Sequence, residues 1–429
     1  MVREAGVAAL LRHADQRRGK LTLRMVVLGT WKGRPVAISV RPNCLTVSVD
    51  HPAEASIFSY DLEGRLWAAF LDGISYRRGL NGRIIARWRS PDNRRERRWL
   101  PPDEALAVEE RAHQTIVALY EAIRSGGAPL KTPLPPEGHT AFRRAIAFDT
   151  ERSRADAKRY HEIYKPIGIL PPDQYMAVVL QASEGCPFNT CTFCNFYRDR
   201  PFRIKRPDEF RAHAEAVREF LGAGLSLRRS IFLGDANALA IPMKRLRPLI
   251  EIVHEVYDVE GLGGIYAFLD GFSGEKKSQQ DYAGLARRGL RRVYIGMEIG
   301  NEALLRFLKK PGTPDDVIRA VQAIKAGGVA VGVIILLGAG GRQYAGAHIR
   351  DTIRVLNAMD LGRSDIIYFS ELVVSEGLEY ARDAHRVGLE PLTHQERIAQ
   401  GEAIERGLKF SRQPDAPRIS RYDIREFIY

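Results

Sequence analysis

Hydrophobic and polar residues alternate in four short runs near the start of the chain. The runs cover residues 21–28, 35–40, 45–49 and 55–60, and turn residues separate them. A period of two residues is typical of strands that bury one face, so the pattern predicts a small antiparallel sheet. A short helix is predicted before this sheet, at residues 8–12.

The spacing of hydrophobic residues becomes helical after the sheet. It predicts an amphipathic helix over residues 104–125, which Gly126 and Gly127 end. We therefore predict a β-rich α+β domain with a closing helix over residues 1–128. Residues 129–172 contain seven prolines and predict a Pro-rich wrapping linker.

From residue 173 onward, predicted strands alternate with predicted helices. The predicted strands are 175–183, 229–234, 263–269, 291–297, 330–337 and 365–372. Such alternation indicates right-handed βα units and a parallel sheet. Six units are too few for a closed eight-stranded barrel. The predicted fold class is therefore α/β, with a partial (β/α)6 TIM-like barrel over 173–375 and a C-terminal helical extension over 376–429.

The composition places the chain among ordinary globular proteins. Hydrophobic residues make up 45% and charged residues 27% of the 429 positions. No apolar run reaches the roughly 18–20 residues that a membrane span needs. The first residues also lack the apolar core of a secretory signal. We expect a cytoplasmic protein without a membrane span.

The positive charge is concentrated in the N-terminal quarter. Residues 1–100 carry 19 Lys and Arg against 9 Asp and Glu, whereas the net charge of the whole chain is +13. Basic clusters with neighbouring aromatic residues occur at 76–83 and 94–98. They are compatible with exposed loops on a solvated surface, or with contacts to RNA or another polyanion. Alternatively, Arg77, Arg78 and Arg83 face the active site and hold an anionic group of a smaller substrate.

Three of the four cysteines fall within nine positions. Cys186, Cys191 and Cys194 follow the predicted strand 175–183, at the end where α/β sheets and barrels place their chemistry. Three thiolates can hold three corners of a 4Fe–4S cluster and leave one iron open. Structural zinc is the competing interpretation, but it prefers four ligands. The fourth cysteine, Cys44, is predicted to be a small core residue.

The cysteine loop resembles that of the radical SAM superfamily. Its spacing is Cys-x4-Cys-x2-Cys, which is similar to a subgroup with one residue more than the commonest Cys-x3-Cys-x2-Cys form. The resemblance implies that S-adenosyl-L-methionine (SAM) binds the open iron. It also implies that Phe193 lies beside the adenine, with Asn195 near the cofactor.

Further motifs that resemble this superfamily follow at the ends of later strands. By resemblance, Gly234, Asp235 and Asn237 receive the SAM ammonium, although a strand-end Asp is equally typical of a helix cap. Glu298 resembles a glutamate that contacts SAM, and a buried carboxylate at a strand end is costly without a polar partner. Gly338 is similar to a glycine that opens the wall for adenine.

Several cations continue the cysteine loop and are candidates for the SAM carboxylate or a substrate anion. They are Arg198, Arg200, Arg203 and Lys205.

The resemblance implies an oxidoreductase-type radical enzyme. A reducing carrier of the flavodoxin or ferredoxin type would reduce the cluster. SAM would then be cleaved to a 5′-deoxyadenosyl radical that abstracts hydrogen from the substrate. Only Cys44 remains for an auxiliary cluster, and the N-terminal domain shows no Asp-x-His-x-x-Gly pattern of the kind found in cobalamin enzymes. We expect a small-molecule substrate. The alternative is an RNA- or polyanion-binding iron–sulfur protein, including a nucleic-acid-modifying enzyme.

Overall fold

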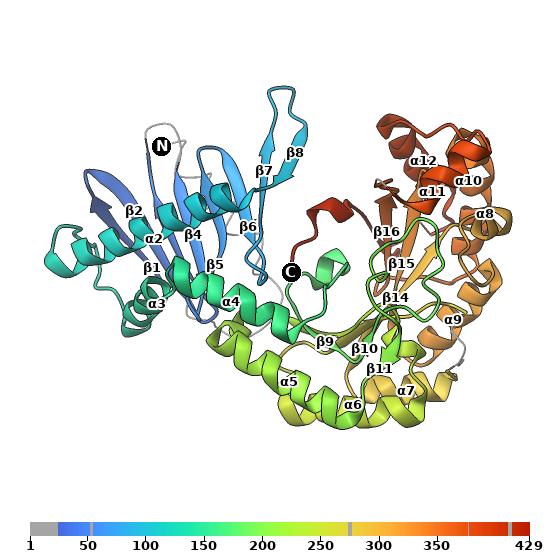
Figure 1. Ribbon diagram of the computed structural model, residues 1–429, viewed down its shortest axis with the longest axis horizontal. Coiled ribbons are helices and arrows are strands. Elements are labelled where there is room, and N and C mark those ends of the chain that lie inside the picture. Colours follow the sequence, from blue (N-terminus) through green and yellow to red (C-terminus); the bar gives the residue numbers. More distant parts are fainter. Residues whose placement is uncertain (1–24, 52–54, 273–276, 376, 411–413) are drawn as a thin grey trace.

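The computed structural model describes residues 25–51, 55–272, 277–375, 377–410 and 414–429 (Figure 1). The short helix predicted at 8–12 lies outside these residues.

The N-terminal part is an eight-stranded antiparallel sheet in which each strand pairs with the next along the chain. Its strands are β1 (Met25–Trp31), β2 (Arg34–Arg41), β3 (Cys44–Val49), β4 (Ser56–Asp61), β5 (Leu66–Leu71), β6 (Ile74–Arg78), β7 (Ile84–Arg89) and β8 (Arg95–Trp99). The prediction of an antiparallel sheet is confirmed. The predicted closing helix is present as α2 (Pro102–Ser125). Cys44 is buried, as predicted.

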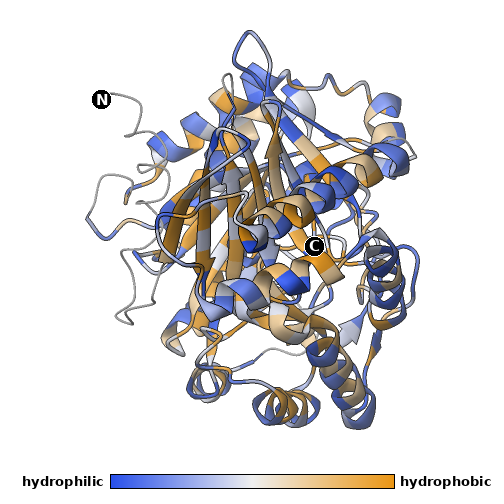
Figure 2. Ribbon diagram, turned by 90° about the vertical axis from the view of Figure 1, so that its left-hand side faces the viewer, coloured by the Kyte–Doolittle hydropathy of each residue, from blue (hydrophilic) through white to orange (hydrophobic). Residues whose placement is uncertain are grey.

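Helices α2 and α3 (Pro136–Ala147) cover one face of this sheet (Figure 1). Alternation along each strand buries one set of side chains beneath these helices, including Ile38 and Phe58, which share one core with Ile116 of α2. Figure 2 shows hydrophobic residues gathered on the strands and hydrophilic residues on the outer sides of the helices.

Two expectations about this region need correction. Residues 76–78 of the first basic cluster lie in β6 and residues 79–83 in the turn that follows, whereas the second cluster, 94–98, lies mostly in β8 rather than in a loop. The segment 129–172, which looked like a wrapping linker, contains α3 and α4 (Thr150–Ile163). Pro136 stands in the first turn of α3, where proline is compatible with a helix because its missing N–H has no partner there. The Asp149 side chain caps α4 by accepting the backbone N–H of Arg152.

The second sheet is parallel and contains all six predicted strands. In spatial order they are β9 (Ala177–Gln181), β12 (Ser230–Gly234), β13 (Ile265–Phe268), β14 (Leu290–Glu298), β15 (Ala330–Leu337) and β16 (Ile366–Glu371). A seventh strand, β17 (Arg418–Tyr422), pairs in parallel with β16. β9 and β17 do not pair with each other, so the barrel is open. The predicted partial barrel is confirmed, whereas the C-terminal extension is not purely helical.

Helices connect these strands and cover the outside of the sheet (Figure 1). They are α5 (Pro207–Leu221), α6 (Met243–Val256), α7 (Gln279–Arg287), α8 (Glu302–Phe307), α9 (Pro314–Ala326) and α10 (Gly341–Asn357), followed by α11 (Glu379–Arg386) and α12 (His394–Gly407). A two-stranded ribbon of β10 (Ser183–Glu184) and β11 (Arg203–Ile204) brackets the cysteine loop.

Buried polar contacts join the two parts. Arg65 of β4–β5 makes two hydrogen bonds to Asp156 of α4 and also donates to the carbonyls of Phe220 and Leu221. The carbonyl of Tyr429, the last residue, accepts the N–H of Leu80. None of the helices in the described part of the chain is long and apolar enough to cross a membrane.

Candidate functional site

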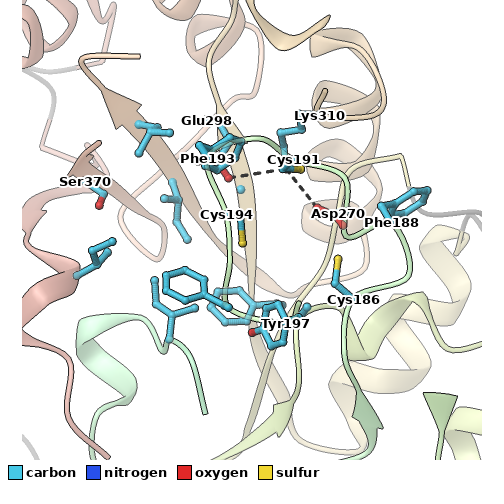
Figure 3. A pocket seen from close by; sticks show the side chains of 18 of the residues that line it. Cys186, Phe188, Cys191, Phe193, Cys194, Tyr197, Asp270, Glu298, Lys310 and Ser370 are labelled. Carbon is cyan, nitrogen blue, oxygen red and sulfur yellow. Dashed lines mark hydrogen bonds and ion pairs between the residues drawn. The ribbon is translucent and has the colours of Figure 1, made fainter. Parts of the chain in front are cut away.

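A cavity opens at the carboxyl ends of the barrel strands, and all three clustered cysteines line it (Figure 3). The other walls come from the ends of β13, β14, β15 and β16 and from the C-terminal segment. This is the place where sheets of this kind position reactive groups.

Hydrogen bonds within the loop fix the positions of the cysteines. The exposed side chain of Arg198 donates to the carbonyls of Cys191, at 3.0 Å, and Cys194, at 3.3 Å. The backbone N–H of Asn189 donates to the sulfur of Cys186 at 3.5 Å. The Asn189 side chain donates to the carbonyl of Tyr197. Residues of the loop itself therefore stabilise its conformation.

Buried ion pairs anchor both ends of the loop. Arg200 donates to Asp235 Oδ2 at 3.1 Å and 3.2 Å, and the same oxygen accepts the N–H of Gly185. Arg203 and Lys205 both bind the Glu184 carboxylate and hold its pKa down, to about 2, against the opposing effect of burial. All four cations after the cysteines thus hold protein groups, and their suggested role as anion ligands is not supported by these contacts.

Three clustered thiols are a donor set that can hold three corners of a 4Fe–4S cluster. Among the residues that the structure describes, no three Cys, His, Asp or Glu side chains are arranged to hold one metal ion. A cubane cluster binds each thiolate through a different iron, so its ligands stand further apart. Burial raises the pKa of all three thiols, that of Cys191 to about 12. Cluster binding would therefore release protons from them.

A charged triad lies beside the cysteines. Lys310 Nζ is 3.4 Å from Asp270 Oδ1 and 3.7 Å from Glu298 Oε1 (Figure 3). Burial opposes the charge on Lys310, but the two carboxylates outweigh it and raise the pKa of this amine. Burial also raises the pKa of Glu298. Asn237 holds Asp270 by two hydrogen bonds of 3.1 Å, one from its amide and one to its oxygen.

The backbone of β14 is shaped to present Glu298. The pairing of β14 with β15 shifts register between Gly296 and Glu298, and Glu298 has a φ of 62°. This conformation is unfavourable for a residue with a side chain and is typical of functional sites. A Cβ on Gly296 would lie 2.3 Å from Glu298 Oε1, so glycine is required for this carboxylate position.

The predicted cofactor contacts divide into two groups. Phe193 and Glu298 line the cavity with the cysteines. The others are not among its lining residues: Asn195, Gly234, Asp235, Asn237 and Gly338. Asn195 is exposed. The space beside Gly338 is taken by Arg397 of α12, whose Cδ would be 2.7 Å from an added Cβ.

The sequence analysis missed four polar residues of the cavity: Asp270, Lys310, Ser370 and Tyr422. Asp270 directly follows a predicted strand, so the rule that singled out Glu298 would have found it. Tyr422 had no comparable signal, because it belongs to the unpredicted strand β17.

Residues 180–354 match the model of the Radical SAM superfamily. A comparison with curated proteins gave no match.

Several solved structures align with parts of the chain at low similarity. The cobalamin-dependent S-adenosylmethionine radical enzyme OxsB aligns with 14% identity and a TM-score of 0.36, over 54% of this chain and 31% of OxsB. SuiB from Streptococcus suis, bound to S-adenosylmethionine, aligns with 11% identity and a TM-score of 0.41, over 82% of this chain and 72% of SuiB. Coproporphyrinogen III oxidase (HemN) from Escherichia coli aligns with 12% identity and a TM-score of 0.39, over 53% of each chain. The chain thus spans about a third of OxsB and half of the oxidase.

Proposed function

We propose that the chain is a radical SAM enzyme, because residues 180–354 match the model of that superfamily, and that it binds a 4Fe–4S cluster through Cys186, Cys191 and Cys194. The observation that carries the proposal is that these three thiols line one cavity together with strand-end carboxylates. When bound, the cluster would supply the electron that cleaves SAM and generates a 5′-deoxyadenosyl radical. A carrier of the flavodoxin or ferredoxin type is the proposed source of that electron.

We assign SAM to the side of the cavity that Phe193, Asp270 and Glu298 form. SAM carries a sulfonium and an ammonium group, and the triad of one lysine and two carboxylates leaves this wall with a net negative charge. Phe193 offers an aromatic face for the adenine. Asn237 acts on the site indirectly, since it orients Asp270.

We propose no direct contact between SAM and four of the candidate residues: Asn195, Gly234, Asp235 and Gly338. Asp235 already accepts hydrogen bonds from Arg200, Gln181 and the backbone, so its oxygens are engaged in anchoring the loop.

We propose a small-molecule substrate that presents an uncharged region to the radical. The wall that faces the cluster loop consists mainly of hydrocarbon side chains: Ile334, Leu336, Leu372, Val373 and Ile424. Its polar groups are the hydroxyls of Ser370 and Tyr422, and Ser370 lies on the side of the cavity opposite Cys186 (Figure 3). A dry wall of this kind excludes water and protects a reactive carbon.

The test is SAM cleavage by anaerobically reconstituted protein. With dithionite and SAM, the protein should form 5′-deoxyadenosine, which chromatography detects. Cys191→Ala should lose iron and activity together. Cys44→Ala is the matched control, because Cys44 is buried in the N-terminal sheet and should leave the iron content unchanged. Iron-loaded, reduced protein that forms no 5′-deoxyadenosine with candidate substrates would contradict the proposal.

A further inference from the structure

One face of the strands β6, β7 and β8 carries a row of arginines. In the sheet register Arg87 lies opposite Arg97, and Arg89 lies opposite Arg95. Opposite residues of a sheet point to the same face, and Arg77 is a diagonal neighbour of Arg87 on that face. This is the face that α2 and α3 leave uncovered. The row is therefore turned away from the core of its own domain.

Part of this row enters a pocket between the N-terminal sheet and the barrel. We call it the junction pocket and define it by five lining residues: Arg41, Arg77, Arg87, Arg228 and Arg229. The first three come from the N-terminal sheet and the last two from the segment before β12. No carboxylate of the described residues lies within ion-pair distance of any of these five guanidinium groups.

The nearby carboxylates are already engaged. Asp61 lines the pocket, but one of its oxygens accepts three successive backbone N–H groups and the other lies 3.5 Å from Arg65. The carboxylate of Glu426 pairs with Arg97, and only its backbone carbonyl accepts a hydrogen bond from Arg87, at 2.7 Å. Asp61 attracts Arg228 at longer range, but none of the described carboxylates forms an ion pair with the five arginines, so positive charge exceeds negative charge in the junction pocket.

Three N–H donors that line the junction pocket are buried without a hydrogen-bond partner. They are Arg87 Nε, Arg228 Nε and the indole Nε1 of Trp67. Burial and the neighbouring Arg87 lower the pKa of Arg77, as expected for cations held close together. Buried donors without a partner cost free energy unless a ligand satisfies them.

Aromatic rings hold the guanidinium groups in place. Arg77 lies over Trp67, with 4.5 Å between its Cζ and the ring centroid, and Arg228 lies over Tyr429 at 5.5 Å. Stacking leaves the edges of a guanidinium group available for hydrogen bonds. Preorganised guanidinium edges bind phosphate oxygens in pairs.

We propose that the junction pocket binds the phosphate or diphosphate group of a small organic phosphate. The positive charge of several arginines is more than one carboxylate can neutralise. A phosphate ester is better matched, because it carries about −1.5 to −2 charges at neutral pH. A second cavity shares Arg77 and Arg87 and continues along the sheet past Ile57, Phe70 and Trp88. It offers a partly apolar surface for the body of the ligand.

A small ligand suits this geometry better than RNA does. The unpartnered donors are buried between two parts of the protein, whereas a nucleic-acid strand needs an open basic track along the surface. The proposal concerns a site other than the cysteine cavity and does not depend on the radical reaction.

The experiment is calorimetric titration of the full-length, iron-loaded protein with inorganic diphosphate and with inorganic phosphate. We expect diphosphate to bind more tightly and to raise the melting temperature. Arg77→Gln should weaken diphosphate binding at least tenfold. Arg228→Gln tests the barrel side independently and decides the question if the first variant does not fold. Arg83→Gln is the control, because Arg83 is exposed, stacks on Trp99 and lies outside the pocket.

Two results would overturn the proposal. One is the failure of both anions to bind, or binding that the folded Arg77 and Arg228 variants leave unchanged. The other is tight, strongly salt-dependent binding of single-stranded RNA that Arg83→Gln weakens as much as Arg77→Gln, since this would indicate an open polyanion surface. Both pocket variants should keep their iron content and SAM cleavage, which separates this test from that of the radical chemistry.

Discussion

Arg200 and Asp235 form the buried ion pair that ties the cysteine loop to the second barrel strand. Their side chains are 6% and 3% exposed, and Asp235 also accepts the N–H of Gly185, next to Cys186. Arg200→Gln removes the cation and leaves the carboxylate buried. Breaking one side of a buried pair costs about 3–5 kcal/mol, so we expect a loss of this size in the free energy of unfolding. Urea unfolding followed by far-UV circular dichroism measures it.

The pH dependence gives an independent check. Burial raises the pKa of Asp235 despite Arg200, and the pKa should rise further in the variant. The folded variant then binds a proton more tightly than the unfolded chain does. The loss in free energy of unfolding, relative to the wild type, should therefore become smaller as the pH falls from about 7.5 to about 5.5. Arg206→Gln is the matched control, because the Arg206–Asp208 pair is exposed, and its removal should not change stability measurably.

A second probe locates the damage within the chain. Tryptophan fluorescence reports on the N-terminal sheet, since all four tryptophans lie there: Trp31, Trp67, Trp88 and Trp99. If the barrel unfolds separately from the N-terminal sheet, Arg200→Gln should lower the urea midpoint less when unfolding is followed by fluorescence than when it is followed by circular dichroism. An Arg200→Gln protein as stable as the wild type at neutral pH would refute the reasoning, because Asp235 would then have another counter-charge.

Three further substitutions test single contacts. Tyr429→Phe removes the hydroxyl that accepts the N–H of Val179, so urea unfolding should show a loss of about 1–3 kcal/mol; an unchanged midpoint would contradict this. Gly296→Ala places a Cβ at 2.3 Å from Glu298 Oε1, so SAM cleavage should fall while the circular dichroism spectrum is kept. Lys310→Met leaves two neighbouring carboxylates without their cation. Its melting temperature should fall at neutral pH and recover at lower pH as the carboxylates protonate, and a pH-independent change would exclude this cause.

The barrel was predictable because its signals are local. Each of the six strands is a short apolar run followed by a helix with regular spacing, and the cysteine spacing needs no tertiary information. The role of Asp235 was harder to predict, because a strand-end carboxylate has the same sequence pattern whether it binds a ligand or an arginine. Only the fold places Arg200, 35 residues away in the sequence, against it.

The errors share a physical cause in long-range contacts. The prolines of 129–172 suggested a linker, but Pro136 begins a helix that is stabilised by packing Phe142 into the N-terminal core. The strands β6 and β8 carry too many arginines to look like strands. They form because their backbones pair with β5 and β7, and because Arg78 reaches Glu109 of α2 at 2.7 Å.

The C-terminal segment explains how an open barrel can persist. An open sheet has two edges whose backbone groups need partners. Residues 418–422 pair with β16 as the seventh strand, and seven residues later the Tyr429 hydroxyl accepts the N–H of Val179 and donates to the carbonyl of Ala177 in β9. The same segment places Tyr422 and Ile424 in the cysteine cavity. Because it satisfies groups at both sides of the opening and lines the cavity, the C-terminal segment is part of the site itself.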